Sequence, residues 1–173
     1  MIARLTAGLA TLCLLSAPVF AQGAKPTDPQ IAHIAYTAGQ LDIEAAKQAL
    51  EKSKNKEVRD FAQDMVRDHT EVNKQALALV TKLNVKPKDN DTSRALTQQA
   101  KAKHDELSKL NGAAFDKAYV ANEVAYHKTV NAALESTLIP SANNAELKSL
   151  LQTGLKIFQG HQQHAEHVAA DVK

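Results

Sequence analysis

Two distant segments of the chain share one pattern, V-x-x-H-x-x-V-N. The residues that fit it are Val66, His69, Val72 and Asn73 in one copy and Val124, His127, Val130 and Asn131 in the other. Steps of three and four return to the same face of an α-helix, so each histidine lies in line with apolar side chains. Histidine is more often partly exposed, and apolar cores usually exclude polar atoms. The repeat therefore predicts two matching helices, each of which directs a histidine toward a core.

The two repeated histidines are the strongest functional signal in the sequence. A buried imidazole can be a structural group that is hydrogen-bonded across a helical bundle. It can equally be a ligand or a proton carrier of a functional site. The pattern around His69 and His127 leaves both interpretations open.

The first residues have the three-part layout of a secretory signal. Arg4 precedes an apolar run over residues 5–15, and Val19 and Ala21 are small residues at the exit. Such a run is too short to remain in a bilayer as a membrane anchor. We predict that residues 1–21 are a signal peptide cleaved after Ala21, that residues 22–27 are a polar leader, and that the mature protein is periplasmic.

The composition of the chain argues against several classes of protein. The sole cysteine, Cys13, lies in the predicted signal and follows Leu12, where a lipoprotein signal requires a small residue. We therefore expect neither a lipid anchor nor disulfide bonds in the mature chain. Without Arg4, the 21 basic residues become 20 against 19 acidic ones, and the two signs are interspersed. This pattern predicts no nucleic-acid binding, and no later stretch is apolar enough to cross a membrane.

Helical periodicity covers the rest of the chain. We predict one all-α domain over residues 28–173, with Asp28 and Asn55 as helix N-caps. At about 1.5 Å per residue, a helix over residues 93–110 would carry the chain back along the domain, so the helices on either side of it would run parallel. This is a ferritin-like four-helix bundle with an extra helix in a long crossover. The predicted helices span residues 28–54, 56–83, 93–110, 113–138 and 145–172.

The candidate site consists of polar residues that lie at similar distances from one end of the predicted bundle. His69 and His127 each lie about four turns from the same end of the predicted bundle. Glu123 lies one turn before His127, so their side chains can contact the same metal ion or water molecule, or each other. The other candidates near this level are Glu44 in the first helix and His161 or His164 in the last.

Particular segments resemble a known family. They are FAQDMVRDHT at residues 61–70, LNGAAFDKAYV at residues 110–120, His127, a glutamate matching Glu44, and a C-terminal histidine matching His161 or His164. The mature chain is similar over nearly its whole length to the secreted bacterial family catalogued as domain of unknown function 4142. The resemblance implies a ferritin-like fold and a location in the cell envelope, and its members are often labelled putative membrane or outer-membrane proteins. No activity is established for it.

Two functions remain compatible with these sequence features. A standard di-iron site uses Glu-x-x-His on two helices, and the chain contains no such motif, so that construction is disfavoured. The sequence favours a non-enzymatic envelope or stress-related module with a buried His/carboxylate belt, with a protein partner in the envelope. The alternative is a metal-binding or redox protein that takes zinc, copper or iron. Its ligands would come from His69, His127, Glu44, Glu123, His161 and His164.

Overall fold

The computed structural model describes residues 25–172, and this part of the chain is all-α, without a strand. The predicted signal peptide and the first residues of the polar leader lie outside the described residues. No helix within residues 25–172 has the length and apolar character needed to cross a membrane. The helices are α1 (Asp28–Lys52), α2 (Lys56–Lys82), α3 (Asp91–Ser108), α4 (Gly112–Ala133), the π-helical turn η1 (Leu134–Leu138), α5 (Ile139–Ser141) and α6 (Ala145–Asp171).

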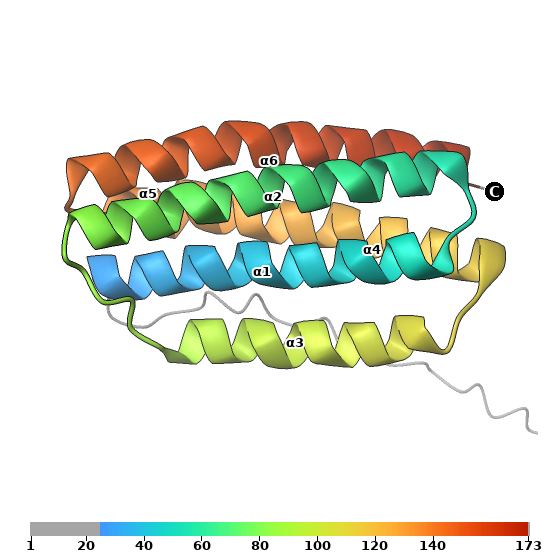
Figure 1. The fold of residues 1–173 in the computed structure, drawn as a ribbon, viewed down its shortest axis with the longest axis horizontal. Coiled ribbons are helices and arrows are strands. Elements are labelled where there is room, and N and C mark those ends of the chain that lie inside the picture. The colour runs from blue at the N-terminus through green and yellow to red at the C-terminus, as the bar shows by residue number, and fades with distance from the viewer. Residues whose placement is uncertain (1–24, 173) are drawn as a thin grey trace, which may run out of the picture.

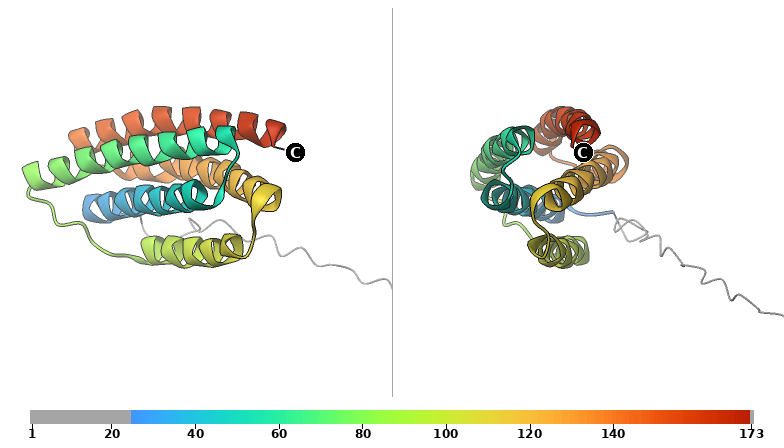
Figure 2. Two further views of the ribbon diagram at one scale, coloured as in Figure 1. Left: turned by 45° about the vertical axis from the view of Figure 1, so that its right-hand side comes forward. Right: turned by 90° about the vertical axis from the view of Figure 1, so that its right-hand side faces the viewer.

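Four long helices pack around one interior. α1 contacts α2, α2 contacts α6, α6 contacts α4, and α4 contacts α1, which closes a ring. α2 and α4 run in the same direction because α3 carries the chain back between them (Figure 1). Seen along the bundle, α3 stands outside the ring (Figure 2), and its contacts are mainly with α1. The predicted crossover helix and the parallel arrangement of its neighbours are both present.

One of the two predicted N-caps is confirmed and the other is wrong. Asn55 caps α2, and its side chain accepts hydrogen bonds from the backbone N–H groups of Glu57 and Val58. The prediction for Asp28 is wrong, because Thr27 is the N-cap of α1.

The Asp28 carboxylate has a different role. It accepts hydrogen bonds from the backbone N–H groups of Asn143 and Asn144, at 2.8 and 2.9 Å. These residues belong to the turn before α6. Asp28 therefore ties the start of α1 to a turn that is distant in sequence, a contact that local capping rules do not predict.

The helix predicted over residues 113–138 is interrupted near its end. The regular α-helix stops at Ala133, and η1 follows over Leu134–Leu138. Pro140 is the second residue after this turn and has no N–H to donate to a carbonyl of the preceding turn. A local change in hydrogen-bond register, as in η1, is one way in which a helix accommodates such a break.

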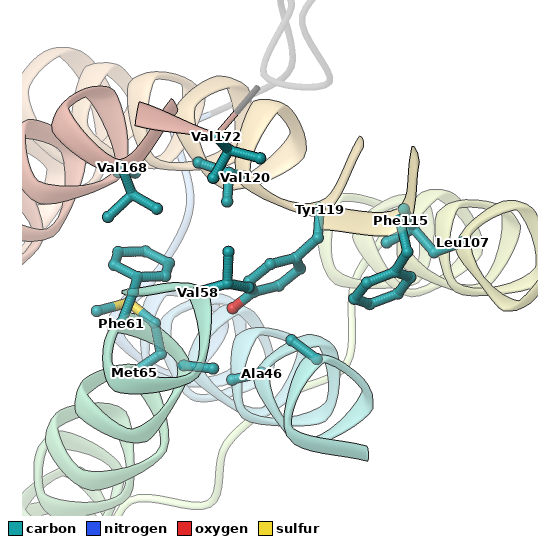
Figure 3. Packing of buried hydrophobic residues seen from close by; sticks show 13 residues of the cluster. Ala46, Val58, Phe61, Met65, Leu107, Phe115, Tyr119, Val120, Val168 and Val172 are labelled. Atoms are coloured by element: carbon teal, nitrogen blue, oxygen red, sulfur yellow. The ribbon is translucent and has the colours of Figure 1, made fainter. Parts of the chain in front are cut away.

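The apolar core has two halves. One lies near the end of α6 and contains Phe61, Phe115 and Tyr119, all fully buried (Figure 3). The other lies near the start of α6 and contains Ile31 and Phe158. Buried polar residues lie between these halves.

The inward face of α1 differs from the predicted stripe. The apolar spacing of this helix predicts Leu41 and Ala45 in the core, but both are only partly buried, and Asp42 and Ala46 occupy the core positions. The reason is that α1 has neighbours on several sides. Leu41, Asp42 and Ala45 all line a cavity between α1, α3 and α4, but only Asp42 also contacts the histidines inside the ring.

Candidate metal centre

One layer of polar side chains separates the two apolar halves. In each helix of the ring, these side chains replace core positions between apolar residues of both halves, as Asp42 does between Ala38 and Ala46 of α1. All are at most 6% exposed. We call this set the polar cluster. Its members are Asp42 of α1, His69 of α2, Glu123 and His127 of α4, and His161 of α6.

The three histidines of the polar cluster converge. The ring centroids of His69 and His127 lie 5.8 Å apart, and the His161 ring lies 5.2 Å from the first and 5.5 Å from the second. One nitrogen from each ring lies within 4.8 Å of the others. The repeated histidines thus lie side by side, as their equal depth predicts.

The two carboxylates lie against these rings. Oδ2 of Asp42 is 2.6 Å from Nε2 of His69 and 3.4 Å from Nε2 of His127. Asp42, Glu123 and His127 also each offer an atom within 4.8 Å of the other two. The five side chains therefore form one continuous group, and His127 is common to both sets of three.

Two of the histidines have a fixed tautomer. Nδ1 of His127 lies 3.0 Å from the backbone carbonyl of Glu123, and since a carbonyl only accepts, Nδ1 must carry the proton. Nε2 of His161 lies 3.0 Å from Oδ2 of Asp68. Burial raises the pKa of Asp68, but Arg67 and His161 outweigh it and hold that pKa below its ordinary value. The carboxylate is therefore an acceptor, and Nε2 of His161 donates to it.

As a consequence, the remaining nitrogens of these rings carry lone pairs that point into the cluster. Nε2 of His127 and Nδ1 of His161 have no well-aligned hydrogen-bond partner. The same is true of both nitrogens of His69 and of all four carboxylate oxygens of Asp42 and Glu123. Buried polar atoms are normally paired, and leaving one unpaired costs about 1–3 kcal/mol. So many in one place indicate a ligand or bridging water.

The two carboxylates differ in protonation. Burial by itself raises the pKa of Asp42, but His69, His127 and a hydrogen bond from Glu123 together outweigh burial and hold this pKa below its ordinary value. Burial, reinforced by the charge of Asp42, raises the pKa of Glu123 well above its ordinary value. Two adjacent carboxylates that share one proton show this division. The directions of the two pKa shifts therefore predict that Asp42 carries the charge and that Glu123 holds the proton.

Burial also keeps two of the imidazoles neutral. It lowers the pKa of His127, although the charge of Asp42 opposes the change. It lowers the pKa of His161 to about 4, although the bond to Asp68 opposes the change. A neutral imidazole is the form that binds a metal ion.

Two predicted site residues lie apart from the polar cluster. Glu44 is exposed and lies at the cavity between α1, α3 and α4. The side chain of His164 is 39% exposed, packs against the Phe61 ring at 5.1 Å and lies 3.9 Å from Asp64. His161 is therefore the inward member of the C-terminal pair. The position expected for Glu44 is taken by Asp42.

Sequence reasoning missed Asp42, although one signal could have found it. Asp42 lies four residues after Ala38 and four before Ala46, so it is aligned with small residues that suit a close helix contact. An aspartate is usually assigned to the solvated face, and the neighbouring Leu41 is the more apolar choice for a core position. A search for acidic residues within an alanine stripe would have selected Asp42.

The asparagines of the repeat hold neighbouring helices. Nδ2 of Asn73 donates to the carbonyl of Tyr36, at 3.4 Å, and Nδ2 of Asn131 donates to Oε1 of Gln162, at 3.1 Å. Gly39 permits the first contact, since a Cβ there would lie 2.5 Å from Oδ1 of Asn73. Each copy of the repeat thus combines a histidine of the cluster with an asparagine that bonds to the adjacent helix.

The fold and the site define a class of protein: an all-α helical protein with a buried cluster of histidine and acidic side chains. The family model described as "Domain of unknown function (DUF4142)" matches residues 15–168, and the chain belongs to that family. Neither the curated proteins nor the solved structures contain a significant match to the chain.

Contact between the two repeated histidines predicts energetic coupling. His69→Ala and His127→Ala should be non-additive, with a coupling of about 0.5–3 kcal/mol, the range for residues in one network. The measurement is a double-mutant cycle from chemical unfolding in the presence of a chelator. Additive effects would show that each histidine is stabilised separately.

Proposed function

We propose that the polar cluster binds one divalent transition-metal ion, zinc, copper or iron, and that this is the function of the domain. The observation that carries the proposal is the convergence of one nitrogen each from His69, His127 and His161, with free lone pairs on His127 and His161, beside the ionised Asp42. Imidazole and carboxylate groups are ligands that suit these metals.

The distances support this assignment. Nitrogen atoms bound to one tetrahedral zinc ion at about 2.0–2.1 Å lie about 3.3–3.4 Å apart. The three histidine nitrogens already lie within 4.8 Å of one another, so small side-chain movements suffice. Asp42 would be a fourth ligand. Glu123 would supply a further oxygen after it loses its proton.

The second nitrogen of His127 and of His161 makes the kind of hydrogen bond that metal-bound histidines make. Metal-bound histidines generally donate their second N–H to a carbonyl or a carboxylate, which fixes the ring. His127 does so to the Glu123 carbonyl, and His161 does so to Asp68. We infer that these contacts preserve the orientation in which the free nitrogen points inward.

We also propose that the bundle is ferritin-like, on the basis of the parallel α2 and α4 helices and the crossover through α3. It would not be a standard di-iron bundle, because Glu-x-x-His is absent from the sequence. One acid–histidine pair, Glu123 and His127, comes from α4, while α2 has Met65 where α4 has Glu123. This asymmetry favours a site dominated by histidine that holds one ion.

The test is direct metal binding by the protein without a histidine tag. Protein prepared this way should contain a transition metal by elemental analysis. After removal with a chelator, it should bind one zinc ion per chain in calorimetric titration. Release of protons should accompany binding, because Glu123 must ionise to become a ligand. The absence of any saturable binding would overturn the metal assignment.

A second candidate is a structural module without metal. The 2.6 Å contact between His69 and Asp42 favours it, since buried polar side chains that pair with each other need no metal ion between them. In this case the domain would act through a protein partner in the cell envelope.

A periplasmic location, inferred from residues 1–21, accompanies both candidates. An intact mass that begins at Gln22 would support it, and a retained signal would contradict it.

A further inference from the structure

A cavity of about 790 Å³ lies between α3 and the pair formed by α1 and α4. We call it the α3 cavity. α3 is held near its two ends, where Leu96 and Leu107 are buried and Nε2 of Gln48 donates to the carbonyl of His104 at 3.0 Å. Between these contacts the helix presents the small side chain of Ala100 to the cavity. The space therefore arises because α3 stands outside the ring (Figure 2).

The inner wall of the α3 cavity includes part of the polar cluster. Asp42 and Glu123 both line the cavity, whereas the three histidines of the cluster do not. Their carboxylate oxygens lack hydrogen-bond partners, as does Oε1 of Gln48, which is also buried and lines the cavity. The charged Asp42 and Oε1 of Gln48 can coordinate a cation directly, and Glu123 can do so once it has lost its proton. The buried end of the cavity is thus suited to a hydrated cation.

The histidines are covered from the other side. The Phe158 ring stacks on His69 with a centroid distance of 4.6 Å and an angle of 9°. The Asp68 carboxylate accepts a hydrogen bond from Nε2 of His161, the ring nitrogen that faces away from the cluster. An ion that approached from α2 and α6 would have to displace these groups, whereas an ion in the α3 cavity would meet the wall that contains the buried Asp42 and Glu123 before it met any histidine of the cluster.

We propose that the metal ion enters through the α3 cavity and is bound first by Asp42 and Glu123, before the histidines. This inference rests on the proposed function, because it concerns the same ion. Carboxylate oxygens can bind an ion that still holds part of its water shell. The histidine nitrogens then replace the remaining water, and His127, which belongs to both sets of three, lies at the point of transfer.

A route of entry has a kinetic consequence that differs from the effect of a lost ligand. A side chain that fills the α3 cavity raises the barrier for both entry and exit, but changes neither the free ion nor the bound state. The rate constants for association and dissociation should therefore fall by the same factor. The Kd, which is their ratio, should remain unchanged.

The experiment uses Co²⁺ as the probe, because its visible absorption reports binding in stopped-flow mixing. Ala100→Trp and Ala125→Trp fill the cavity from α3 and from α4. Ala102→Trp is the matched control, because Ala102 is exposed on α3 and does not line the cavity. Both cavity variants should slow association and dissociation by about tenfold or more, within the range over which such rates vary. The control should bind and release Co²⁺ at the wild-type rates.

The outcomes separate the two proposals. If the wild type binds Co²⁺ and a folded cavity variant keeps both wild-type rates, the route is wrong and the metal site stands. A variant that weakens affinity through faster release also overturns the route, since it shows a disturbed site. If the wild type binds no Co²⁺ or Zn²⁺ at equilibrium, both proposals fail. Circular dichroism identifies folded variants, and two variants from different helices provide independent tests.

Discussion

His127→Ala should abolish the stabilisation that a metal ion gives to the protein. A ligand that binds only the folded state stabilises it by about 4 kcal/mol at a free concentration one thousand times its Kd. In a chain of this size, that stabilisation raises Tm by about 8–16 °C. His127 belongs to both sets of three potential ligands, so its loss leaves neither set complete. Thermal unfolding with and without added zinc should show the rise for the wild type and no rise for the variant.

The matched control is His167→Ala. His167 belongs to the same C-terminal helix as His161, but its side chain is 78% exposed and lies 3.5 Å from Asp171. Its removal should leave the zinc-dependent rise in Tm unchanged. If His167→Ala removed the rise and His127→Ala preserved it, the ion would be bound at the exposed end of α6.

The depth of the histidines could be predicted from the sequence because it depends on regular geometry. A helix advances by a fixed distance per residue, and the segment over residues 93–110 is long enough to return the chain. These two facts bring His69 and His127 to one level before any contact is known. The burial of His161 follows the same rule, although the choice between His161 and His164 required the packing of α6.

The residue that α1 supplies to the polar cluster could not be predicted in the same way. Its stripe is composed of small residues, so neighbouring phases of the helix differ little in apolar content. The choice between Glu44 and Asp42 depends on where α3 lies, and α3 itself has only a thin apolar stripe. The α3 cavity and the Asp28 contact with the turn before α6 are likewise tertiary features. None of them has a signal within one segment.

The division of charge between the two carboxylates predicts opposite effects for two similar substitutions. Asp42→Asn removes a buried charge beside His69 and should cost about 3–5 kcal/mol of unfolding free energy, as for one partner of a buried pair. Glu123→Gln replaces a protonated carboxyl by an amide of the same shape that cannot titrate, and should leave stability unchanged or raise it near neutral pH. Chemical unfolding near neutral pH with a chelator measures both without a contribution from metal.

The pH dependence provides an independent test of the same division. The folded chain keeps a proton on Glu123 at pH values where the unfolded chain has released it. Unfolding then releases a proton, so this group lowers stability progressively as pH rises above its ordinary pKa of 4.5. Glu123→Gln cannot titrate and should remove that loss. Asp42 acts in the opposite sense, because its contribution is present above its ordinary pKa of 3.8 and is lost as pH falls through its lower folded pKa.

Comparison of the two variants therefore locates the proton. If Glu123→Gln were the more costly change near neutral pH, the charge would reside on Glu123, and the inward end of the α3 cavity would present a different first ligand to an entering ion. If both substitutions were nearly neutral, the 2.6 Å contact of Asp42 with His69 would contribute little to folding. The polar cluster would then be maintained by selection for what it binds, since a buried layer of five ionisable side chains that adds no stability is otherwise less favourable than an apolar one.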